Sequence, residues 1–360
     1  MGAWGENMLV LMPDAAFEDD AEVEREVLGE GVEIVVHREL VADRIPDADW
    51  RRADALIVYY GVPIDRQLIA RLDGCRVLVR AGVGYDHIDV AACAARGIPV
   101  CNVPDYGTTE VADHAIALML ALARGLVSYH ARLLADPRAG WHWSGAPLVR
   151  RLRGGTLGVV GMGRIGTAAS RRASALDMEV CFYDPYLPDG TELGLGYRRV
   201  DSLPALLAQS DVVSLHCPLT EHNRNLIDEA ALRAIKPGAL LINTARGGLV
   251  DLVALETALR EGQLGGAGLD VLPGEPPDPE HPLIEAFRRR EPDLDGRLLL
   301  TPHVAWFSAA GRGDLRRKSA ETARAFLREG RLRNCVNRAA LEAAERQVEP
   351  GQPVGSALSL

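Results

Sequence analysis

A glycine-rich turn between an expected strand and an expected helix restricts the fold of this chain more than any other feature. The motif Gly-x-Gly-x-x-Gly spans 161–166, between the apolar run 157–160 and the helical pattern 167–176. In such a unit the first glycine permits a tight turn, the second lets the backbone approach a pyrophosphate, and the third lets the helix pack against the strand. The N-terminus of the helix presents oriented N–H groups to the anion. The turn therefore predicts a dinucleotide-binding βαβ unit.

An acidic residue follows at the distance expected for a ribose contact. The next expected strand, 179–183, ends at Asp184, about 20 residues after the glycines. A carboxylate at this position accepts hydrogen bonds from the ribose hydroxyls and repels a 2′-phosphate, and no arginine follows it immediately. The sequence therefore predicts NAD rather than NADP as the cofactor.

Short apolar runs alternate with helical patterns in both halves of the chain, which predicts α/β folding with parallel sheets covered by helices. One long helix is expected over 108–124, with Thr108 and Thr109 as capping candidates. It is apolar on nearly every face, so we expect it to be buried between domains or between subunits. Residues 136–155 show no sustained period and are interpreted as a connector.

Composition excludes several classes of protein. With 48% hydrophobic and 25% charged residues, the chain of 360 residues is that of a globular protein. Its longest apolar run is nine residues, Ala115–Ala123, whereas a membrane-spanning helix needs about 20. The formal charge of −10 repels nucleic acid and anionic lipid, and six cysteines without a C-x-x-C pair indicate neither zinc nor disulfides. We expect a cytoplasmic protein with no exported leader, no membrane partner, no nucleic-acid partner and no metal.

Three further motifs follow expected strands of the dinucleotide-binding sheet, where loops distant in sequence can converge on a ligand. Arg246 offers a planar fork for a substrate carboxylate. His303 can give or take a proton at a substrate oxygen, because imidazole titrates near neutral pH. Glu275, if it bonds the other ring nitrogen, would orient that imidazole. Together they predict the proton-transfer half of a hydride-transfer reaction.

A second glycine turn, Gly82-Val83-Gly84, follows the expected strand 77–79. Successive backbone N–H groups in such a turn can form a nest for an anion. We interpret it as a candidate site for the substrate carboxylate. A turn with only a structural role would have the same sequence pattern.

With these motifs the sequence resembles the D-isomer-specific 2-hydroxyacid dehydrogenase family. The resemblance runs from about 81 to 304 and rests on GVGYDHIDV, VVGMGRIG, LHCPLT, NTARGGLVD and LTPH. It implies that Arg246, Glu275 and His303 are the catalytic residues. It also implies that hydride passes between NADH and a small 2-oxo acid, giving a D-2-hydroxy acid, with histidine as the proton donor.

Within that family the sequence is most similar to the C-terminal-binding protein branch, whose members are NAD(H)-sensing corepressors. The matching segments are FYDPYLPDG (182–190), SLHCPLTEHN (214–223), HVAW (303–306) and RNCVN (333–337). This finer resemblance implies that Trp306 and Arg80 lie close to the substrate. Where the family has Asp-Asn, this chain has Asp86-His87, which puts the role of that Asn in doubt.

The candidate residues fall into three sets, and no metal-binding set is expected. The catalytic set is Arg246, Glu275 and His303. The substrate set is Arg80, Gly82, Val83, Gly84, Arg246 and Trp306. The cofactor set is Val83, Thr109, Gly161, Gly163, Arg164, Ile165, Gly166, Asp184, His216, Cys217, Pro218, His222, Asn243, Thr244, Ala245, Arg246, Asp270, His303 and Trp306.

The resemblance also implies how the domains are arranged. We expect two Rossmann-like, doubly wound parallel-sheet domains with an active-site cleft between them. The NAD-binding domain, 105–306, is inserted into a substrate domain made of 1–104 and 307–345, and the tail 346–360 is expected to be disordered. Composition alone would have given two consecutive domains.

The sequence leaves two alternative functions open and suggests how the chain assembles. A dinucleotide-sensing interaction protein and a phosphoglycerate dehydrogenase-like enzyme are the alternatives to the 2-hydroxyacid dehydrogenase. A homodimer is expected, because the family is usually dimeric and the apolar helix 108–124 with Trp141 and Trp143 suggests a two-fold interface.

Overall fold

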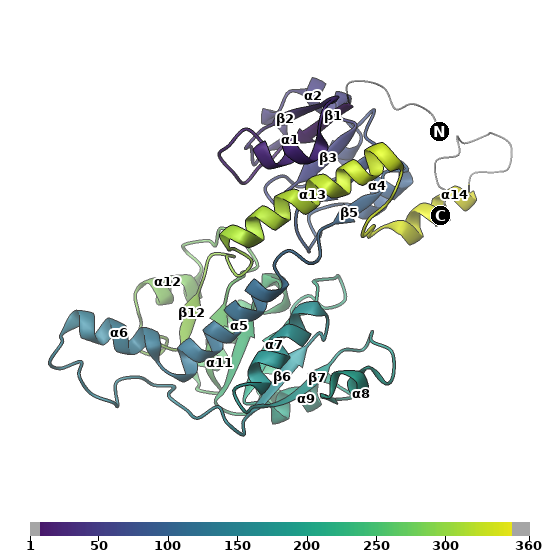
Figure 1. Cartoon of the computed structure of the whole chain (residues 1–360). Coiled ribbons are helices and arrows are strands. Elements are labelled where there is room, and N and C mark those ends of the chain that lie inside the picture. The colour runs from purple at the N-terminus through teal and green to yellow at the C-terminus, as the bar shows by residue number, and fades with distance from the viewer. Residues whose placement is uncertain (1–7, 348–360) are drawn as a thin grey trace. The chain divides into compact units, whose positions relative to one another are not determined.

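The computed structural model describes residues 8–347, and the chain divides into two compact units. Unit 1 runs through Gly107 and resumes at Ser308, while unit 2 is Thr108–Phe307. Each unit contains one parallel sheet with helices packed against it (Figure 1). The predicted α/β class is therefore confirmed for both units. The assignment of a substrate role to one unit stays a prediction.

Unit 1 is built on a five-stranded sheet in the order β2-β1-β3-β4-β5. Every neighbouring pair is parallel. Its strands are short and almost wholly apolar, as expected for a sheet covered on both faces. Their bounds are β1 (Met8–Met12), β2 (Val32–Val36), β3 (Ala55–Val58), β4 (Val77–Arg80) and β5 (Val100–Asn102).

The helices of unit 1 come from both parts of the chain. The first part contributes α1 (Glu22–Leu28), the 3₁₀ turn η1 (Ala42–Arg44), α2 (Asp47–Arg52), α3 (Arg66–Ile69) and α4 (Val90–Ala95). The returning part contributes α13 (Ala309–Glu329) and α14 (Arg338–Gln347). The long helix α13 packs beside α1, as Figure 1 shows. It begins at Ala309, because the Ser308 hydroxyl accepts a hydrogen bond from the Gly311 N–H and caps the helix.

Unit 2 is built on a seven-stranded parallel sheet in the order β12-β11-β10-β9-β6-β7-β8. Strand order reverses between β6 and β9, and ligands of open α/β sheets bind outside such a switch point. The bounds are β6 (Thr156–Val160), β7 (Glu179–Tyr183), β8 (Arg198–Arg199), β9 (Val212–Leu215), β10 (Ala239–Asn243), β11 (Leu264–Leu269) and β12 (Leu298–Leu300). The short β8 was not predicted, because two arginines carry no apolar strand pattern.

The helices of unit 2 alternate with these strands. They are α5 (Thr108–Ala123), α6 (Leu126–Ala135), α7 (Arg164–Ser174), α8 (Thr191–Leu195), α9 (Leu203–Gln209), α10 (Glu229–Ala234), η2 (Gly247–Leu249), α11 (Leu252–Arg260) and α12 (Pro282–Arg288). Several begin at a side-chain cap that the sequence supplies. Asp228 caps α10 and Asp251 caps α11, each accepting backbone N–H groups of the first turn.

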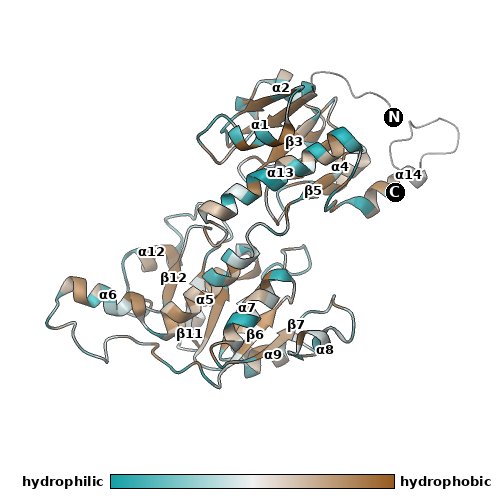
Figure 2. Cartoon of the chain, in the orientation of Figure 1, coloured by the Kyte–Doolittle hydropathy of each residue, from teal (hydrophilic) through white to brown (hydrophobic). Residues whose placement is uncertain are grey.

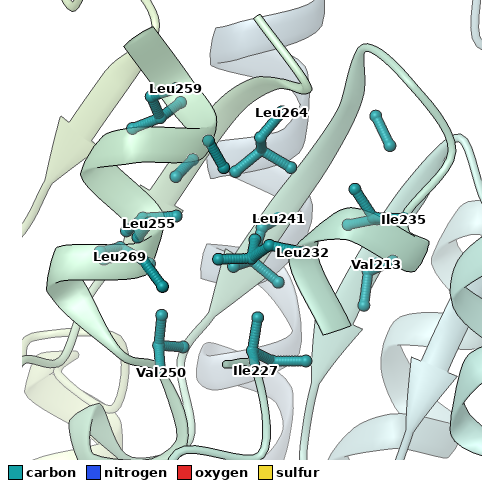
Figure 3. Packing of buried hydrophobic residues seen from close by; sticks show 14 of the residues in the cluster. Val213, Ile227, Leu232, Ile235, Leu241, Val250, Leu255, Leu259, Leu264 and Leu269 are labelled. Carbon is teal, nitrogen blue, oxygen red and sulfur yellow. The ribbon is translucent and has the colours of Figure 1, made fainter. Parts of the chain in front are cut away.

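Apolar side chains cover both faces of the unit 2 sheet. On one face Leu241 and Leu269 pack against Leu232 of α10 and Leu255 of α11 (Figure 3). On the other face α5 and α7 cover the sheet. The hydropathy colouring of Figure 2 shows the strands of both units as predominantly apolar. This packing holds the ends of the strands, from which the candidate site extends.

The apolar helix expected over 108–124 is buried, and its buried residues pack within unit 2. As α5 it buries Leu118, Met119 and Leu122 in the same cluster as Leu240 and other residues of the unit 2 sheet. It is therefore a core helix of its own unit, and its apolar character is explained without a neighbouring subunit. Within 8–347 no single helix is long and apolar enough to cross a bilayer. Only α5 and α6 taken together reach that length, and they are bent by 57° at their junction.

Several helices were not predicted, including the short α2, α8 and α12. The helix α6 was not predicted, because it follows α5 directly after the left-handed Gly125 and every one of its residues remains at least partly exposed. The helix α14 continues to Gln347, so a disordered tail beginning at 346 is wrong at its start. The remainder of that tail, 348–360, lies outside the described residues.

Candidate active site

The glycine-rich turn follows β6 and leads directly into α7, as predicted. Gly161 has a positive φ of 91°, and a Cβ there would lie 2.7 Å from the backbone nitrogen of Cys217. A Cβ on Gly166 would lie 2.2 Å from the carbonyl oxygen of Gly161. These two positions therefore require glycine because backbone segments meet there.

Gly163 is different, because its φ of −75° is open to any residue and a Cβ there would meet no atom within 4 Å. It lies at the N-terminus of α7, where the following N–H groups have no side-chain cap. The space beside Gly163 is therefore open and bounded by the amides at the start of α7, which fits the predicted pyrophosphate site, and anion binding there stays a prediction.

Two buried polar atoms at the same sheet edge also fit a bound dinucleotide. Within the described residues, Oγ1 of Thr244 after β10 and Nδ1 of His216 after β9 have no hydrogen-bond partner. Buried polar groups rarely stay unsatisfied, so each is suited to a ligand that this protein structure does not itself supply. Burial lowers the pKa of His216 to about 4, so its ring is neutral, and Nε2 lies 2.9 Å from Oγ of Ser214. The site therefore presents neutral polar atoms as well as helix amides.

Asp184 lies at the end of β7, where the ribose contact was predicted. One of its oxygens accepts a hydrogen bond from the Met162 N–H in the glycine turn, at 3.0 Å, and the other accepts from the Tyr186 N–H. The carboxylate thus holds the glycine turn in place. Each oxygen retains acceptor capacity, so the ribose contact stays compatible with the structure.

Arg246 lies in a tight turn that Asn243 organises. The buried Asn243 side chain accepts from the Ala245 N–H at 3.0 Å and donates to the Arg246 carbonyl at 2.8 Å. A Cβ on Gly247 would lie 1.9 Å from the carbonyl carbon of Leu272, so the turn is packed against the loop after β11. That loop carries Glu275. The turn with Arg246 and the loop with Glu275 are therefore held together, as predicted, because their backbones are in contact at Gly247 and Leu272.

Glu275 and His303 are in direct contact. Nδ1 of His303 donates to Oε2 of Glu275 at 2.6 Å, while Oε1 accepts from the Leu272 N–H at 3.0 Å. Burial raises the pKa of Glu275, but the hydrogen bond and charge of His303 outweigh it, and the net pKa lies below the usual range. The Glu275 carboxylate is thus ionised and fixes which ring nitrogen carries the proton, leaving Nε2 as the other proton-transfer position.

Asp270 braces the loop that carries His303. Its fully buried carboxylate accepts from the N–H groups of Val304 and Ala305, both at 2.9 Å, and from the Thr301 hydroxyl at 2.6 Å. His303 has a positive φ of 52°, which is unusual for a residue with a side chain. Asp270 was predicted to bind NAD. The structure gives it a positioning role, and a direct cofactor contact stays a prediction.

The second glycine turn belongs to unit 1 and follows β4. Arg80 spans it, since Nε donates to the Gly84 carbonyl at 2.7 Å and Nη1 to the Ala81 carbonyl. Gly82 has a positive φ of 146° and lies against the Arg80 guanidinium. The Asn102 side chain holds the Val83 carbonyl at 2.7 Å. The turn is thus built around a buried cation, and its substrate role stays a prediction.

The other predicted residues have less specific surroundings. In the loop after β9, which holds Cys217 and the exposed His222, the Asn223 side chain donates to the Pro218 carbonyl. Thr109 donates to Glu110 in the first turn of α5. Trp306 packs edge to face on Phe307, with ring centroids 5.7 Å apart. Within 8–347 no cluster of three His, Cys, Asp or Glu side chains could hold a metal ion.

One residue near the site, His114, was not among the predicted site residues. Nε2 of His114 lies 3.0 Å from Oγ1 of Thr301, whose hydroxyl in turn donates to Asp270. His114 lies on α5, far from the His303 motif in sequence. The sequence marks His114 only as a titratable side chain inside an otherwise apolar helix. A buried histidine that is hydrogen-bonded within the core and has no role in a site would show the same pattern.

Comparison with protein-family models shows one match. Residues 116–305 match the model of the D-isomer specific 2-hydroxyacid dehydrogenase, NAD binding domain. This range contains the glycine turn, Arg246, Glu275 and His303.

Similar proteins are found among characterised sequences and solved structures. A glyoxylate reductase of Korarchaeum cryptofilum is 38% identical over 304 residues, covering 83% of this chain and 86% of that protein. A D-3-phosphoglycerate dehydrogenase of Methanocaldococcus jannaschii is 37% identical over 275 residues, or 76% of this chain, which thus matches about half (51%) of that longer protein. The crystal structure of a glyoxylate reductase from Paecilomyes thermophila superimposes with a TM-score of 0.79 at 29% identity, covering 92% of this chain and 98% of the other.

Proposed function

Because the chain belongs to the D-isomer-specific 2-hydroxyacid dehydrogenase family, we propose that it reduces a small 2-oxo acid with NADH, using His303 as the proton donor. The protein is an NAD-dependent oxidoreductase acting on CH–OH groups, as its relatives are. The observation that carries the finer proposal is the 2.6 Å hydrogen bond between His303 and Glu275.

His303 supplies the proton for the reduced oxygen. With Nδ1 held by Glu275, the proton to be transferred is on Nε2, and the carboxylate stabilises the charged ring. Arg246, in the turn packed against the Glu275 loop, presents a guanidinium suited to a bidentate contact with the substrate carboxylate. These residues combine proton transfer and carboxylate binding in unit 2.

The cofactor would be held at the switch point of the unit 2 sheet. The amides after Gly163 would take the pyrophosphate, Asp184 the adenine ribose, and Thr244 and His216 further polar groups. When bound, NADH supplies the hydride that the protein's own side chains cannot supply.

The test is NADH oxidation by the purified chain with a panel of 2-oxo acids. The panel runs from glyoxylate and pyruvate through branched, aromatic and thioether acids to phosphohydroxypyruvate. His303→Ala is the loss-of-function variant, and His130→Ala, an exposed position on α6 outside every candidate set, shows what loss of an unrelated histidine does. We expect turnover that falls by about 10² to 10⁴ in His303→Ala and much less in His130→Ala. Equal loss in both variants would contradict the role of His303.

The panel also distinguishes the substrate classes. The similarity to a glyoxylate reductase favours the smallest acids, whereas an aromatic at Trp306 favours a medium-sized apolar or thioether side chain. Trp306→Ala should raise KM mainly for the larger acids. An equal loss for glyoxylate and for long-chain acids would contradict contact between Trp306 and the substrate side chain. A preference for phosphohydroxypyruvate would favour a phosphoglycerate dehydrogenase-like activity.

A binding role remains the second candidate, since the segment 182–190 resembles the C-terminal-binding protein branch. Tyr186 in that segment is largely exposed, so it is accessible to a partner. Tight NADH binding without turnover of any acid would favour a dinucleotide-sensing interaction protein, for which a cytoplasmic location stays a prediction.

A homodimer is the assembly we propose, with α6 and the following connector as the interface. Large apolar side chains are exposed there, including Leu134 at 74%, Trp141 at 79% and Trp143 at 82%. Exposed apolar groups gathered on one element mark contact surfaces. Light scattering should give the mass of two chains, and Leu134→Glu with Trp143→Glu should give one. A monomeric wild-type protein would contradict this interface.

A further inference from the structure

Two cysteines of unit 1, 234 positions apart, face one another at the free edge of its sheet. Cys101 lies in β5, the outermost strand, and Cys335 lies between α13 and α14. The two residues form an antiparallel bridge. Both are free thiols in this structure.

The hydrogen bonds on either side define the geometry of the pair. The Asn102 N–H donates to the Asn334 carbonyl at 3.2 Å, and the Val336 N–H donates to the Val100 carbonyl at 2.8 Å. Cys101 and Cys335 therefore occupy a non-hydrogen-bonded position, where opposed Cα atoms are about 4.5 Å apart and side chains are closest. Disulfides join Cα atoms about 4.4–6.8 Å apart. A non-hydrogen-bonded pair of this kind therefore has a Cα separation that a disulfide can span.

We propose that Cys101 and Cys335 are a reversible oxidation site, which hydrogen peroxide converts into a disulfide. The Cys335 thiolate attacks the peroxide oxygen, the O–O bond breaks, and a sulfenic acid forms on Cys335 while hydroxide leaves. The Cys101 thiol then attacks the Cys335 sulfur, forming the S–S bond and releasing water. Two thiols are oxidised and one peroxide is reduced to two waters. A dithiol reductant restores both thiols.

Cys335 is the residue suited to attack first. It is half-buried, whereas Cys101 is fully buried. Its thiol donates to Oδ1 of Asn337 at 3.3 Å, and Arg338 begins α14 three residues after Cys335. The hydrogen bond between the two thiols lowers the pKa of Cys335 to about 7, with Arg338 acting in the same direction, and it raises that of Cys101. A thiolate near a cation and a helix N-terminus is the reactive form of cysteine.

The remaining cysteines lack these features. Burial raises the pKa of Cys75 and of Cys93 to about 12, and that of Cys217 to about 11. Cys181 is buried and its pKa is also raised. Oxidation by dilute hydrogen peroxide should therefore be selective for the bridge pair.

The disulfide would fasten the returning segment to the first part of unit 1. The bridge lies beside Asn102, whose side chain holds the Val83 carbonyl in the second glycine turn. Asn337, two residues after Cys335, donates to the Ile98 carbonyl and accepts from the Val100 N–H. The disulfide would add one covalent bond to this existing network of hydrogen bonds.

The experiment treats the full-length reduced chain with dilute hydrogen peroxide, blocks remaining thiols with an alkylating reagent, and maps peptides by mass without reduction. We expect one cross-linked product joining the peptides of Cys101 and Cys335, lighter by two hydrogen atoms and separated by dithiothreitol. Amide exchange at Asn102 and Val336 should slow in the oxidised protein, because the disulfide holds their bridge closed.

Variants separate the two steps. In Cys101→Ser a sulfenic acid should accumulate on Cys335 and react with dimedone, and in Cys335→Ser the reaction should be lost. Cys217→Ser is the matched control, because Cys217 is the other half-buried cysteine, and it should cross-link like the wild type. Cys335 should react about tenfold faster than Cys217 or more. A wild-type chain that accumulates dimedone-reactive Cys335 without the cross-link would overturn the proposal, even if a serine variant fails to fold. So would equal reactivity of Cys217.

Discussion

Nδ1 of His303 lies 2.6 Å from Oε2 of Glu275, although 28 residues separate them and they follow different strands. The backbone of His303 has a positive φ, a conformation that costs of order 1–3 kcal/mol for a residue with a side chain. The Asp270 carboxylate holds the next two amides of that loop. Glu275 therefore orients the His303 ring, and Asp270 holds the backbone that carries it. Substitutions of the two acids should therefore change activity in different ways.

Glu275→Gln should lower the rate of 2-oxo acid reduction by about tenfold to a hundredfold at neutral pH. The neutral amide no longer stabilises the charged imidazole that donates the proton. The pH at which reduction falls to half should therefore move to lower values. The pH dependence of kcat/KM measures both effects. Glu280→Gln, an exposed acid in the same loop, should change neither, and an unchanged pH profile in Glu275→Gln would contradict the orienting role.

The same contact predicts a loss at acid pH. Because the pKa of Glu275 is lowered by folding, its ionised form stabilises the site at pH values above the ordinary carboxyl pKa. That contribution is lost as the pH falls through the lowered value in the folded state. Reductive activity in the wild type should therefore persist below the ordinary carboxyl pKa and fall only as the pH reaches the lowered pKa of Glu275. NADH binding measured at the same pH values shows whether loss of the cofactor is the cause instead.

Asp270→Asn should reduce kcat by about a hundredfold, because a small displacement of a positioned catalytic group has that effect. Asparagine retains one acceptor oxygen, but its amide must then face one of the N–H donors of Val304 and Ala305. Thr301→Val removes one hydroxyl contact and leaves both amide contacts, so it should cost less. If Asp270 instead acts by binding NAD, the dissociation constant of NADH will rise and kcat will not fall, which fluorescence titration distinguishes.

Asp184→Ser should move the cofactor preference toward NADPH. The variant removes a charge that repels a 2′-phosphate and replaces a charged acceptor, whose hydrogen bonds are worth about 1.5–3 kcal/mol, with a neutral one. The ratio of kcat/KM for NADH over NADPH should fall by about tenfold or more. Asp189→Ser, in the same loop and fully exposed, should leave the ratio unchanged. A ratio that stays constant in Asp184→Ser would place the ribose elsewhere.

The strand and helix pattern predicted much of this fold because the signals were local. Alternating apolar runs gave the two parallel sheets, and the strand-turn-helix context of 161–166 gave the dinucleotide-binding loop. Two of the elements that were not predicted depend on tertiary structure. The helix α6 packs no residue in a core, and β8 consists of two arginines that pair with β7.

The candidate site was predictable where each residue carried its own chemistry. Arg246, Glu275 and His303 are brought together as expected, because parallel strands end at one edge of the sheet. The roles of Asp270 and His114 were not predictable. Asp270 satisfies backbone amides of a loop 34 residues away, and His114 reaches Thr301 from a helix that looks like simple core. Such contacts depend on packing, which no spacing in the sequence reports.

The glycine turn offers a pair of substitutions that separate binding from folding. Gly163→Ala should leave the thermal midpoint unchanged, because its φ is ordinary and a Cβ there meets no atom. It should still raise the dissociation constant of NADH by about tenfold, a loss of about 1.4 kcal/mol, by occupying the space beside the helix amides. Gly166→Ala should instead destabilise the fold by about 1–3 kcal/mol, since its Cβ would overlap the Gly161 carbonyl. Equal NADH affinity in Gly163→Ala and the wild type would contradict the cradle.

Ion pairs of Arg316 join the two chain segments of unit 1. Arg316 of α13 donates to Glu24 and Asp19, and its guanidinium stacks 3.7 Å above the Phe17 ring. Arg316→Met should cost about 3–5 kcal/mol in urea unfolding, because it leaves the buried Glu24 carboxylate without its partner. The neighbouring Arg317→Met, which breaks a surface pair, should cost about 0–1 kcal/mol. Arg316 also lowers the pKa of Asp19 to about 2, so this contribution is complete above the ordinary value of 3.8 and is lost as the pH falls toward 2. If the two methionine variants unfold at the same urea concentration, the ion pairs do not hold α13 to the first part of the chain, and apolar packing alone does so.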